Sequence, residues 1–350
     1  MAYSSFSEVW MRVLWVSALL FGALIAPGRA ADARSFGPVP IVSAGQPHAS
    51  IVQGDAAGEL SKYAATELQK YLRLLSGAEV PIIAAAEVSS RPGQEALILV
   101  GSPAANPTVR EAAQAKWVNF TGLKPEGFVV KTGSFKGHPA VIVGGNDDVS
   151  AMYAAYELIE RLGVTFTLTG GAVPAVRSDL SVPAMDIRMD PAFSRRGFLL
   201  QSGGFINLSV FSYPDYVKFL DQMAKMKCNY LQFWWFSYEP WLKYSYKGEP
   251  MWMGDVSTKD SGYFTWARSG GGSHTTDDVS IGKEHFKGRR LAPQEFQTVE
   301  TPEEAFAVAG DLLRKVIHHA KKNKGMAGGR AGLSPSQPRA LLRASGRVAV

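Results

Sequence analysis

The spacing of apolar residues changes along the chain and predicts alternating helices and strands. Between positions 57 and 76, apolar residues recur at steps of three and four, which is typical of an amphipathic helix ended by Gly77. Residues 96–100 form a continuous apolar run before Gly101, as expected of a buried strand, and residues 50–52 predict another strand. This alternation favours an α/β or α+β layer over a helical bundle.

A hairpin and a second helix are predicted further along the same region. Two β-rich runs, 127–131 and 140–143, flank the glycine-containing segment 133–138, which is expected to connect them. Asp147 or Asp148 is then placed to cap an amphipathic helix that runs to Leu162-Gly163. The simplest arrangement has the two long helices packed on one face of a small mixed sheet.

A strand, helix and strand follow in the second half of the chain. The predicted elements are a strand at 193–201, a helix at 215–227 and a strand at 230–235. Such βαβ units build parallel sheets whose functional loops follow the carboxyl ends of the strands. After a polar, glycine-rich stretch at 252–290, a strong amphipathic helix is predicted at 303–322. A complete eight-stranded barrel needs about 250 residues, so the pattern predicts the opening of a barrel rather than a whole one.

Both ends of the sequence differ from this globular pattern. Arg12, the apolar run 13–25 and the small pair Ala30-Ala31 are typical of a secretory signal peptide, which predicts cleavage near Ala30. The expected product is secreted or periplasmic, with no membrane span after signal cleavage. Residues 326–350 contain no acidic or aromatic residue, which suggests a disordered tail or, preferably, a frameshift or truncation near Gly325.

Composition narrows the possible partners. The 350 residues are 46% apolar, which allows about two domains with real cores, and the net charge is +6. Because the basic residues are scattered among acids through most of the chain, no nucleic-acid partner is expected. The single cysteine, Cys228, is interpreted as a small packed residue. Histidines and aspartates at 274–285 follow no metal-site spacing, so no metal or other cofactor is predicted.

Several segments resemble known glycoside hydrolases. Residues 63–72, 98–101 and 151–164 are similar to the accessory N-terminal domain of bacterial β-N-acetylhexosaminidases and xylan α-glucuronidases. Residues 191–198 and 219–231 are similar to the first strands and helix of the TIM barrel that follows it in the hexosaminidases. The resemblance implies an α/β protein with an α+β accessory domain, which does not itself carry catalysis, and an incomplete (β/α)8 TIM barrel. The expected divisions are a signal peptide at 1–30, the accessory domain at 36–185, the start of the barrel at 190–325 and the tail at 326–350.

The chain departs from these families where their functional residues lie. Gln201-Ser-Gly-Gly stands where hexosaminidases carry Asp-x-x-Arg, and Gln232, Trp234, Ser237 and Tyr238 stand where their second strand delivers His and Asp. The Asn-His-Trp-Asp run of α-glucuronidases is absent. Glycosidases generally need two carboxylates across the scissile bond, or one acid and a substrate acetamido group. The catalytic residues are therefore unknown, and this chain is expected to lack the catalytic carboxylates.

An aromatic cluster at positions 234–241, at the end of the predicted strand 230–235, supplies the candidate binding residues. Flat rings suit the apolar faces of pyranose sugars, a carboxylate can accept hydroxyl hydrogen bonds, and barrel sites form at the carboxyl ends of strands. The alternative is that these rings pack in the barrel core. The hypotheses are an exported, inactive glycoside-hydrolase-like fragment of polysaccharide degradation, or a non-catalytic protein that binds a polysaccharide or oligosaccharide through this cluster. The candidate substrate-binding residues are Trp234, Trp235, Tyr238, Glu239 and Trp241.

Overall fold

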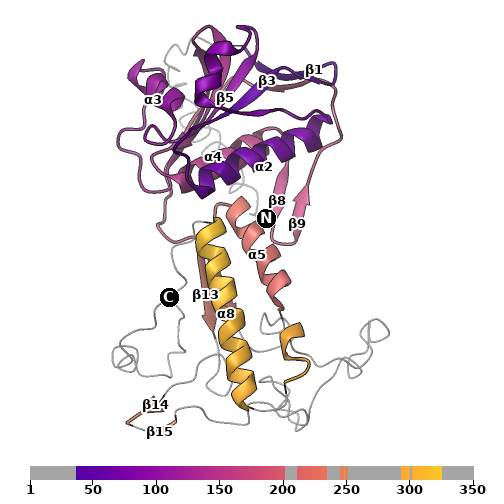
Figure 1. Cartoon of the computed structure of the whole chain (residues 1–350), viewed down its shortest axis with the longest axis vertical. Helices are drawn as coiled ribbons and strands as arrows, with labels where there is room; N and C mark the ends of the chain where they lie inside the picture. The colour runs from indigo at the N-terminus through magenta and orange to yellow at the C-terminus, as the bar shows by residue number, and fades with distance from the viewer. Residues whose placement is uncertain are drawn as a thin grey trace, which may run out of the picture. The chain divides into compact units, whose positions relative to one another are not determined.

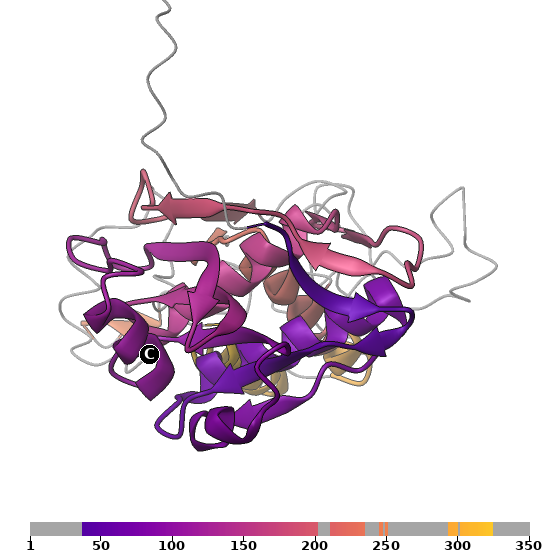
Figure 2. The same ribbon diagram turned by 90° about the horizontal axis from the view of Figure 1, so that it is seen from above.

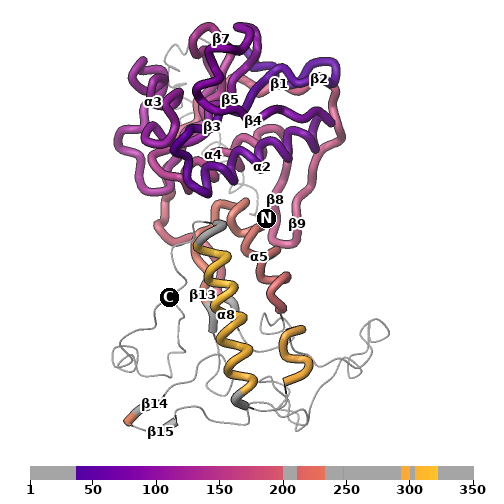
Figure 3. Tube along the Cα trace, in the orientation of Figure 1, coloured from indigo at the N-terminus to yellow at the C-terminus, as the bar shows by residue number. Residues whose placement is uncertain are grey.

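Strands and helices alternate along the polypeptide (Figures 1 and 3). The computed structural model describes residues 37–201, 211–234, 245–247, 249–250, 293–299 and 302–324. The elements before residue 190 are β1 (Val39–Ser43), β2 (Gln46–Pro47), β3 (Ala49–Gln53), α2 (Glu59–Ser76), β4 (Ile82–Ala84), a 3-10 helix (Ala85–Ser90), β5 (Ala96–Gly101), α3 (Pro107–Gln114), β6 (Phe128–Phe135), β7 (His138–Gly145), α4 (Asp148–Arg161), β8 (Thr165–Thr167), β9 (Gly170–Ala172), β10 (Leu180–Val182) and β11 (Asp186–Met189). The later elements are β12 (Gly197–Gln201), α5 (Tyr213–Lys225), β13 (Tyr230–Trp234), β14 (Ser245–Tyr246), β15 (Glu249–Pro250), a 3-10 helix (Gln294–Phe296) and α8 (Pro302–Lys324).

A mixed six-stranded sheet organises the N-terminal region, in the order β11-β6-β7-β5-β3-β4. The strands from β7 to β4 are parallel, whereas β6 is antiparallel to β7 and β11 is antiparallel to β6. Every residue of β5 is buried, as its continuous apolar run predicts. Ile98 belongs to the core on one face of the sheet, and Leu97 and Leu99 belong to the core on the other.

Helices cover both faces of this sheet. The helices α2 and α4 pack together on one face, and in Figures 1 and 2 the strands lie over them. The prediction of helix on one face alone was incomplete, because α3 covers the opposite face with Val109 and Ala112. This helix has eight residues and follows an Asn106 cap, so it offers too few turns for a clear apolar period.

A second, three-stranded sheet closes the same core. Its order is β10-β1-β2, with β1 antiparallel to both neighbours. Val39, Ile41 and Val182 are at most 2% exposed and join the core formed by α2 and α4. The strand β11 lies instead at the edge of the six-stranded sheet, where Asp186 to Met189 pair with β6. The N-terminal sheet therefore extends to Met189.

The predicted hairpin forms, but its connection is shorter than expected. The strands β6 and β7 pair continuously from Phe128 opposite Gly145 to Phe135 opposite His138. Only Lys136 and Gly137 form the turn, both with positive φ (51° and 87°), as a tight two-residue hairpin turn requires. The expectation of a loop at 133–138 was wrong because polar residues at 133–138 also occupy strand positions.

The second half contains the predicted βαβ unit. The strands β12 and β13 are parallel, paired from Gly197 opposite Tyr230 to Gln201 opposite Trp234, and α5 connects them. A Cβ at position 197 would lie 1.6 Å from the Tyr230 carbonyl oxygen, so glycine permits this close approach. The predicted helix at 303–322 is also confirmed, as α8, which packs against α5 and α2. The described residues contain this unit but no closed barrel.

Buried tyrosines lie around α2 and α4 and predict sensitivity to alkali. The Tyr156 hydroxyl is 3.2 Å from both Glu67 Oε2 and the Tyr63 hydroxyl. Burial, and then the Glu67 charge, raise the pKa of Tyr63 and Tyr156, and raise the pKa of Tyr71 to about 12. The folded state therefore holds these phenolic protons more tightly than the unfolded state, whose tyrosine pKa is about 10. The resulting stabilisation is fully present below pH about 10 and is lost as the pH rises through the folded-state pKa.

We therefore expect the free energy of unfolding, measured with urea, to fall steadily as the pH rises above about 10. The Tyr156→Phe variant, which has no hydroxyl to ionise at this position, should lose less stability over the same pH interval. Equal slopes for the parent and this variant would contradict the assignment to Tyr156.

Candidate functional site

The predicted aromatic cluster begins at the carboxyl end of β13. Trp234 is the last residue of this strand and pairs with Gln201, the last residue of β12. Trp235, Tyr238, Glu239 and Trp241 lie outside the described residues. The backbone thus puts the start of the cluster where two parallel strands end, and its role in binding remains a prediction.

A polar cluster at the opposite ends of these strands joins the βαβ unit to the N-terminal domain. We call it the junction cluster and define it as Glu126, Glu157, Arg196, Lys227 and Asn229. Arg196 directly precedes β12, and Asn229 directly precedes β13. Because Glu126 and Glu157 come from the N-terminal domain, the two parts are held together by charged and amide groups.

Asn229 is the centre of the junction cluster and is only 3% exposed. Its amide nitrogen lies 2.9 and 2.8 Å from the two carboxylate oxygens of Glu126 and 2.9 Å from the Ser194 carbonyl oxygen. Its amide oxygen accepts a hydrogen bond of 2.9 Å from the Arg196 backbone N–H. The Arg196 guanidinium binds Glu126 and donates from Nε to the Lys227 carbonyl oxygen at 2.9 Å. The buried amide and carboxylate are therefore satisfied on several sides.

Lys227 forms the second contact of the junction cluster. Its ammonium is 3.0 Å from Glu157 and also binds Glu160. Burial alone would raise the pKa of Glu157, but Lys227 and Arg161 outweigh it and hold that pKa below its usual value. Lys227 and Glu126 both have positive φ, 59° and 66°, which is uncommon for residues with a Cβ. Both unusual backbone positions therefore carry contacts between the two parts of the chain.

Cys228 is packed beside the junction cluster. Its carbonyl oxygen accepts from the Tyr153 hydroxyl at 3.4 Å, and its thiol is free and half-buried. Burial raises the pKa of the thiol, although the nearby Arg196 acts in the opposite direction. A raised pKa reduces the thiolate fraction and hence reactivity, in agreement with the interpretation of Cys228 as a packing residue.

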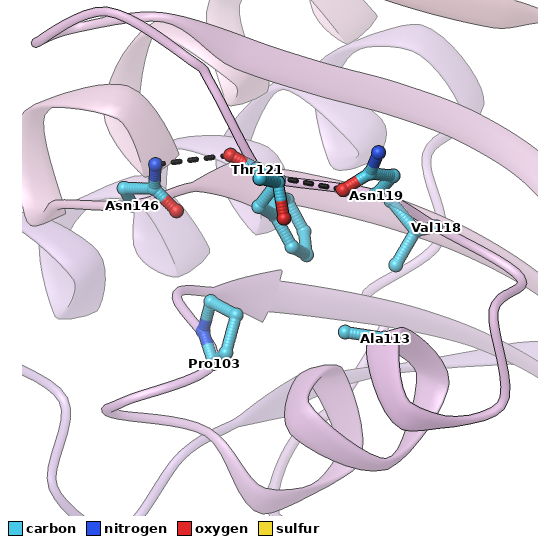
Figure 4. A pocket seen from close by; sticks show the side chains of 7 residues that line it. Pro103, Ala113, Val118, Asn119, Thr121 and Asn146 are labelled. Carbon is cyan, nitrogen blue, oxygen red and sulfur yellow. Dashed lines mark hydrogen bonds between the residues drawn. The ribbon is translucent and has the colours of Figure 1, made fainter.

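A separate pocket of about 280 Å³ opens in the N-terminal domain (Figure 4). It lies beyond the carboxyl ends of β5 and β7, because Pro103 follows the former and Asn146 follows the latter. The segment between α3 and β6 completes the lining, together with one residue of α3. The lining residues are Pro103, Ala113, Val118, Asn119, Phe120, Thr121 and Asn146.

Sequence patterns identified neither the junction cluster nor this pocket. Both combine single polar residues from segments far apart in the chain, such as Glu126 and Asn229, which are separated by 103 positions.

Within the described ranges, no three His, Cys, Asp or Glu side chains are placed to share a metal ion. No helix in those ranges is both long and apolar enough to cross a membrane.

The sequence of the N-terminal domain identifies its class. Residues 44–158 match the family model of the glycosyl hydrolase family 67 N-terminus. This range contains α2, β5 and most of α4, the elements on which the resemblance to xylan α-glucuronidases rested. The match confirms that residues 44–158 resemble the N-terminal domain of glycoside hydrolases, and it relates this part of the chain to carbohydrate-active proteins.

Individual relatives match only part of their own length. An S-layer protein of Methanococcus voltae is 37% identical over 76 residues, which are 22% of this chain and 13% of that protein. The structure of a family GH115 4-O-methyl-α-glucuronidase, with specificity for decorated arabinogalactans, aligns over 82% of this chain and 41% of its own, at 15% identity and a TM-score of 0.43. The GH20 β-N-acetylhexosaminidase from Streptomyces coelicolor A3(2) aligns over 57% and 32%, at 14% identity and a TM-score of 0.35. The chain therefore spans less than half the length of each of these proteins.

Proposed function

We propose that the chain is part of an exported glycoside-hydrolase-like protein of polysaccharide degradation. One observation carries the proposal: a segment of the family 67 N-terminal type is followed by two parallel strands joined by a helix. This is the order of an accessory domain and the opening of a catalytic barrel. The leader-like residues 12–31 support export, which the intact mass of the exported protein tests by showing whether cleavage occurs near Ala30.

In this proposal, carbohydrate binds beyond the carboxyl ends of β12 and β13, over the aromatic cluster from Trp234 to Trp241. Rings that follow a barrel strand suit the apolar faces of sugars, and Glu239 offers acceptors for their hydroxyl groups. We expect binding without hydrolysis by this chain alone. Glycosidases generally need two carboxylates across the scissile bond, or one acid and a substrate acetamido group, and in related barrels these residues come from strands after the second.

Binding is tested by affinity electrophoresis of the parent chain in gels that contain xylan or arabinogalactan. We expect Trp235→Ala and Trp241→Ala each to weaken binding about fivefold to tenfold, as expected when an aromatic contact worth about 1 kcal/mol is lost. Phe193→Ala is the matched control, because Phe193 is an aromatic residue 73% exposed outside the cluster. Unchanged retardation of both tryptophan variants would contradict the proposed binding residues.

Hydrolysis is tested separately with aryl glycosides of xylose, glucuronic acid and N-acetylglucosamine. The purified chain is expected to release no chromophore above the rate of the uncatalysed control. Turnover that survives repurification would refute the expected inactivity and would show that the chain carries catalytic groups of its own.

A further inference from the structure

The N-terminal sheet has two crevices of the kind that usually binds ligands, between β3 and β5 and between β5 and β7, and the first of them is closed. In open α/β sheets, ligands bind beyond the carboxyl ends of neighbouring parallel strands whose connections leave toward opposite faces. Here β3 continues into α2 on one face, and β5 continues into α3 on the other. The fully buried Asn106 fills the space between them, because its amide nitrogen donates to the carbonyl oxygens of Val52 (3.1 Å) and Val100 (2.8 Å).

The open pocket lies one strand further along the same edge, beyond β5 and β7. Its volume of about 280 Å³ is just below the range of about 300–1,000 Å³ that is typical of sites for drug-sized ligands. This size suits a single small ring rather than a nucleotide or a peptide. None of its lining residues carries a charge, so the pocket is suited to a neutral ligand.

One wall of the pocket is polar. Figure 4 shows Asn119, Thr121 and Asn146 along one side. Asn146 Nδ2 donates to the Phe120 carbonyl oxygen (3.1 Å), and Asn119 Oδ1 accepts from the Thr121 backbone N–H (2.8 Å). Within the described part of the chain, Asn119 Nδ2 and Asn146 Oδ1 have no recorded hydrogen bond. The wall therefore offers the Asn119 amide N–H groups, the Asn146 amide oxygen and the Thr121 hydroxyl to a ligand.

The facing wall is apolar. In Figure 4, Pro103 and Ala113 lie opposite the polar side chains, and Val118 extends the apolar lining. A pyranose ring has C–H groups on its faces and hydroxyl groups at its rim. A slot with one apolar wall and one wall of amides and a hydroxyl matches both features.

The polar wall is held in place before any ligand binds. Arg188 of β11 donates from Nη1 to the Asn119 carbonyl oxygen (2.6 Å) and from Nη2 to the Thr121 carbonyl oxygen (2.9 Å). Hydrogen bonds from a charged donor are stronger than those between neutral groups. The segment therefore needs little ordering when a ligand binds, which favours affinity in a small site.

We propose that this pocket binds one neutral pyranose unit of a carbohydrate, as a site distinct from the aromatic cluster. Asn119 Nδ2 and Asn146 Oδ1 hydrogen-bond the sugar hydroxyl groups, and Pro103 and Ala113 contact its C–H face. The ligand class is the same as that of the proposed function, but the residues differ, so either proposal can fail while the other stands.

The test is saturation-transfer NMR on the full chain with methyl β-D-glucopyranoside and methyl β-D-xylopyranoside as probes. We expect binding that Ala113→Leu weakens at least tenfold, because the larger side chain fills the pocket. Asn119→Asp should weaken it similarly, since it removes the donor while keeping the acceptor for the Thr121 N–H. Ala115→Leu, at an exposed position outside the lining, is the matched control and should bind as the parent does.

Two further measurements make the outcome decisive. Trp235→Ala should bind the methyl glycosides at this pocket as the parent does, which separates the pocket from the aromatic cluster. Far-ultraviolet circular dichroism establishes that the variants are folded. The proposal is overturned if the parent binds neither glycoside, or if Ala113→Leu binds them as well as the parent does.

Discussion

Replacing Asn229 by alanine is expected to lower the free energy of unfolding by about 3 kcal/mol, because it breaks a buried hydrogen-bonded network. The truncation removes the amide that binds Glu126 and the oxygen that accepts from the Arg196 N–H. It also removes the donor to the Ser194 carbonyl oxygen. A half-buried carboxylate, an N–H and a carbonyl group then lose a partner together. The measurement is urea unfolding of the full chain, followed by circular dichroism.

A second variant separates this effect from simple loss of volume. Asn229→Asp keeps the size and an acceptor oxygen but places a carboxylate against Glu126, so it should destabilise at least as much as Asn229→Ala. The matched control is Glu111→Ala, which breaks an exposed ion pair with Lys136 (2.6 Å) and should cost less than about 1 kcal/mol. If Asn229→Ala costs no more than this control, the junction cluster does not stabilise the chain.

The second large effect is expected at Gly144 in the central strand β7. A Cβ at this position would lie 1.8 Å from the carbonyl oxygen of Gly101 and 2.9 Å from its carbonyl carbon. Both atoms belong to the backbone of β5, the neighbouring parallel strand, so a side-chain rotation cannot relieve the clash. We expect Gly144→Ala to destabilise the protein by about 3 kcal/mol or more, as overpacking in a rigid core does.

The control for this variant is Gly93→Ala. A Cβ at Gly93 meets no atom within 4 Å, so this change should be neutral or slightly stabilising. Urea unfolding compares the variants, and the soluble yield relative to Gly93→Ala serves if Gly144→Ala does not stay folded. A Gly144→Ala protein as stable and as soluble as the parent would show that β5 and β7 can separate without cost.

The elements predicted from the sequence are those with a strong local pattern. The period of α2 and α4 and the continuous apolar run of β5 each lie within one segment, and all three were confirmed with ends shifted by at most two residues. The Asp147 cap was confirmed as well, since its carboxylate accepts from the Ser150 N–H at 2.7 Å. Local preference and tertiary packing agree at these positions.

What the sequence did not predict depends on contacts between distant segments. The pairing of β11 with β6, and the use of Gly133 inside a strand beside the Trp117 indole, are decided by neighbours far along the chain. Pro125-Glu126-Gly127 has the composition of a turn, but nothing local indicates that Glu126 binds Asn229. The aromatic cluster remains a prediction for the same reason, because its partners would come from other loops.

The contact between Glu126 and Asn229 also constrains the order of folding. This contact closes a loop between residues 103 positions apart in the chain. The entropic cost of closing a loop grows only slowly with the length of the loop. The core on the α3 face of the sheet contains only residues before β8, whereas the core on the α2 and α4 face also contains Leu220 of α5, Leu231 of β13 and Leu312 of α8. The second core is therefore complete only after these later elements have been synthesised. The contacts of Arg196, Lys227 and Asn229 with Glu126 and Glu157 then fix the amino ends of β12 and β13 as this shared core is completed. The N-terminal sheet and the elements that follow it therefore share one buried core, which favours their folding as one cooperative unit.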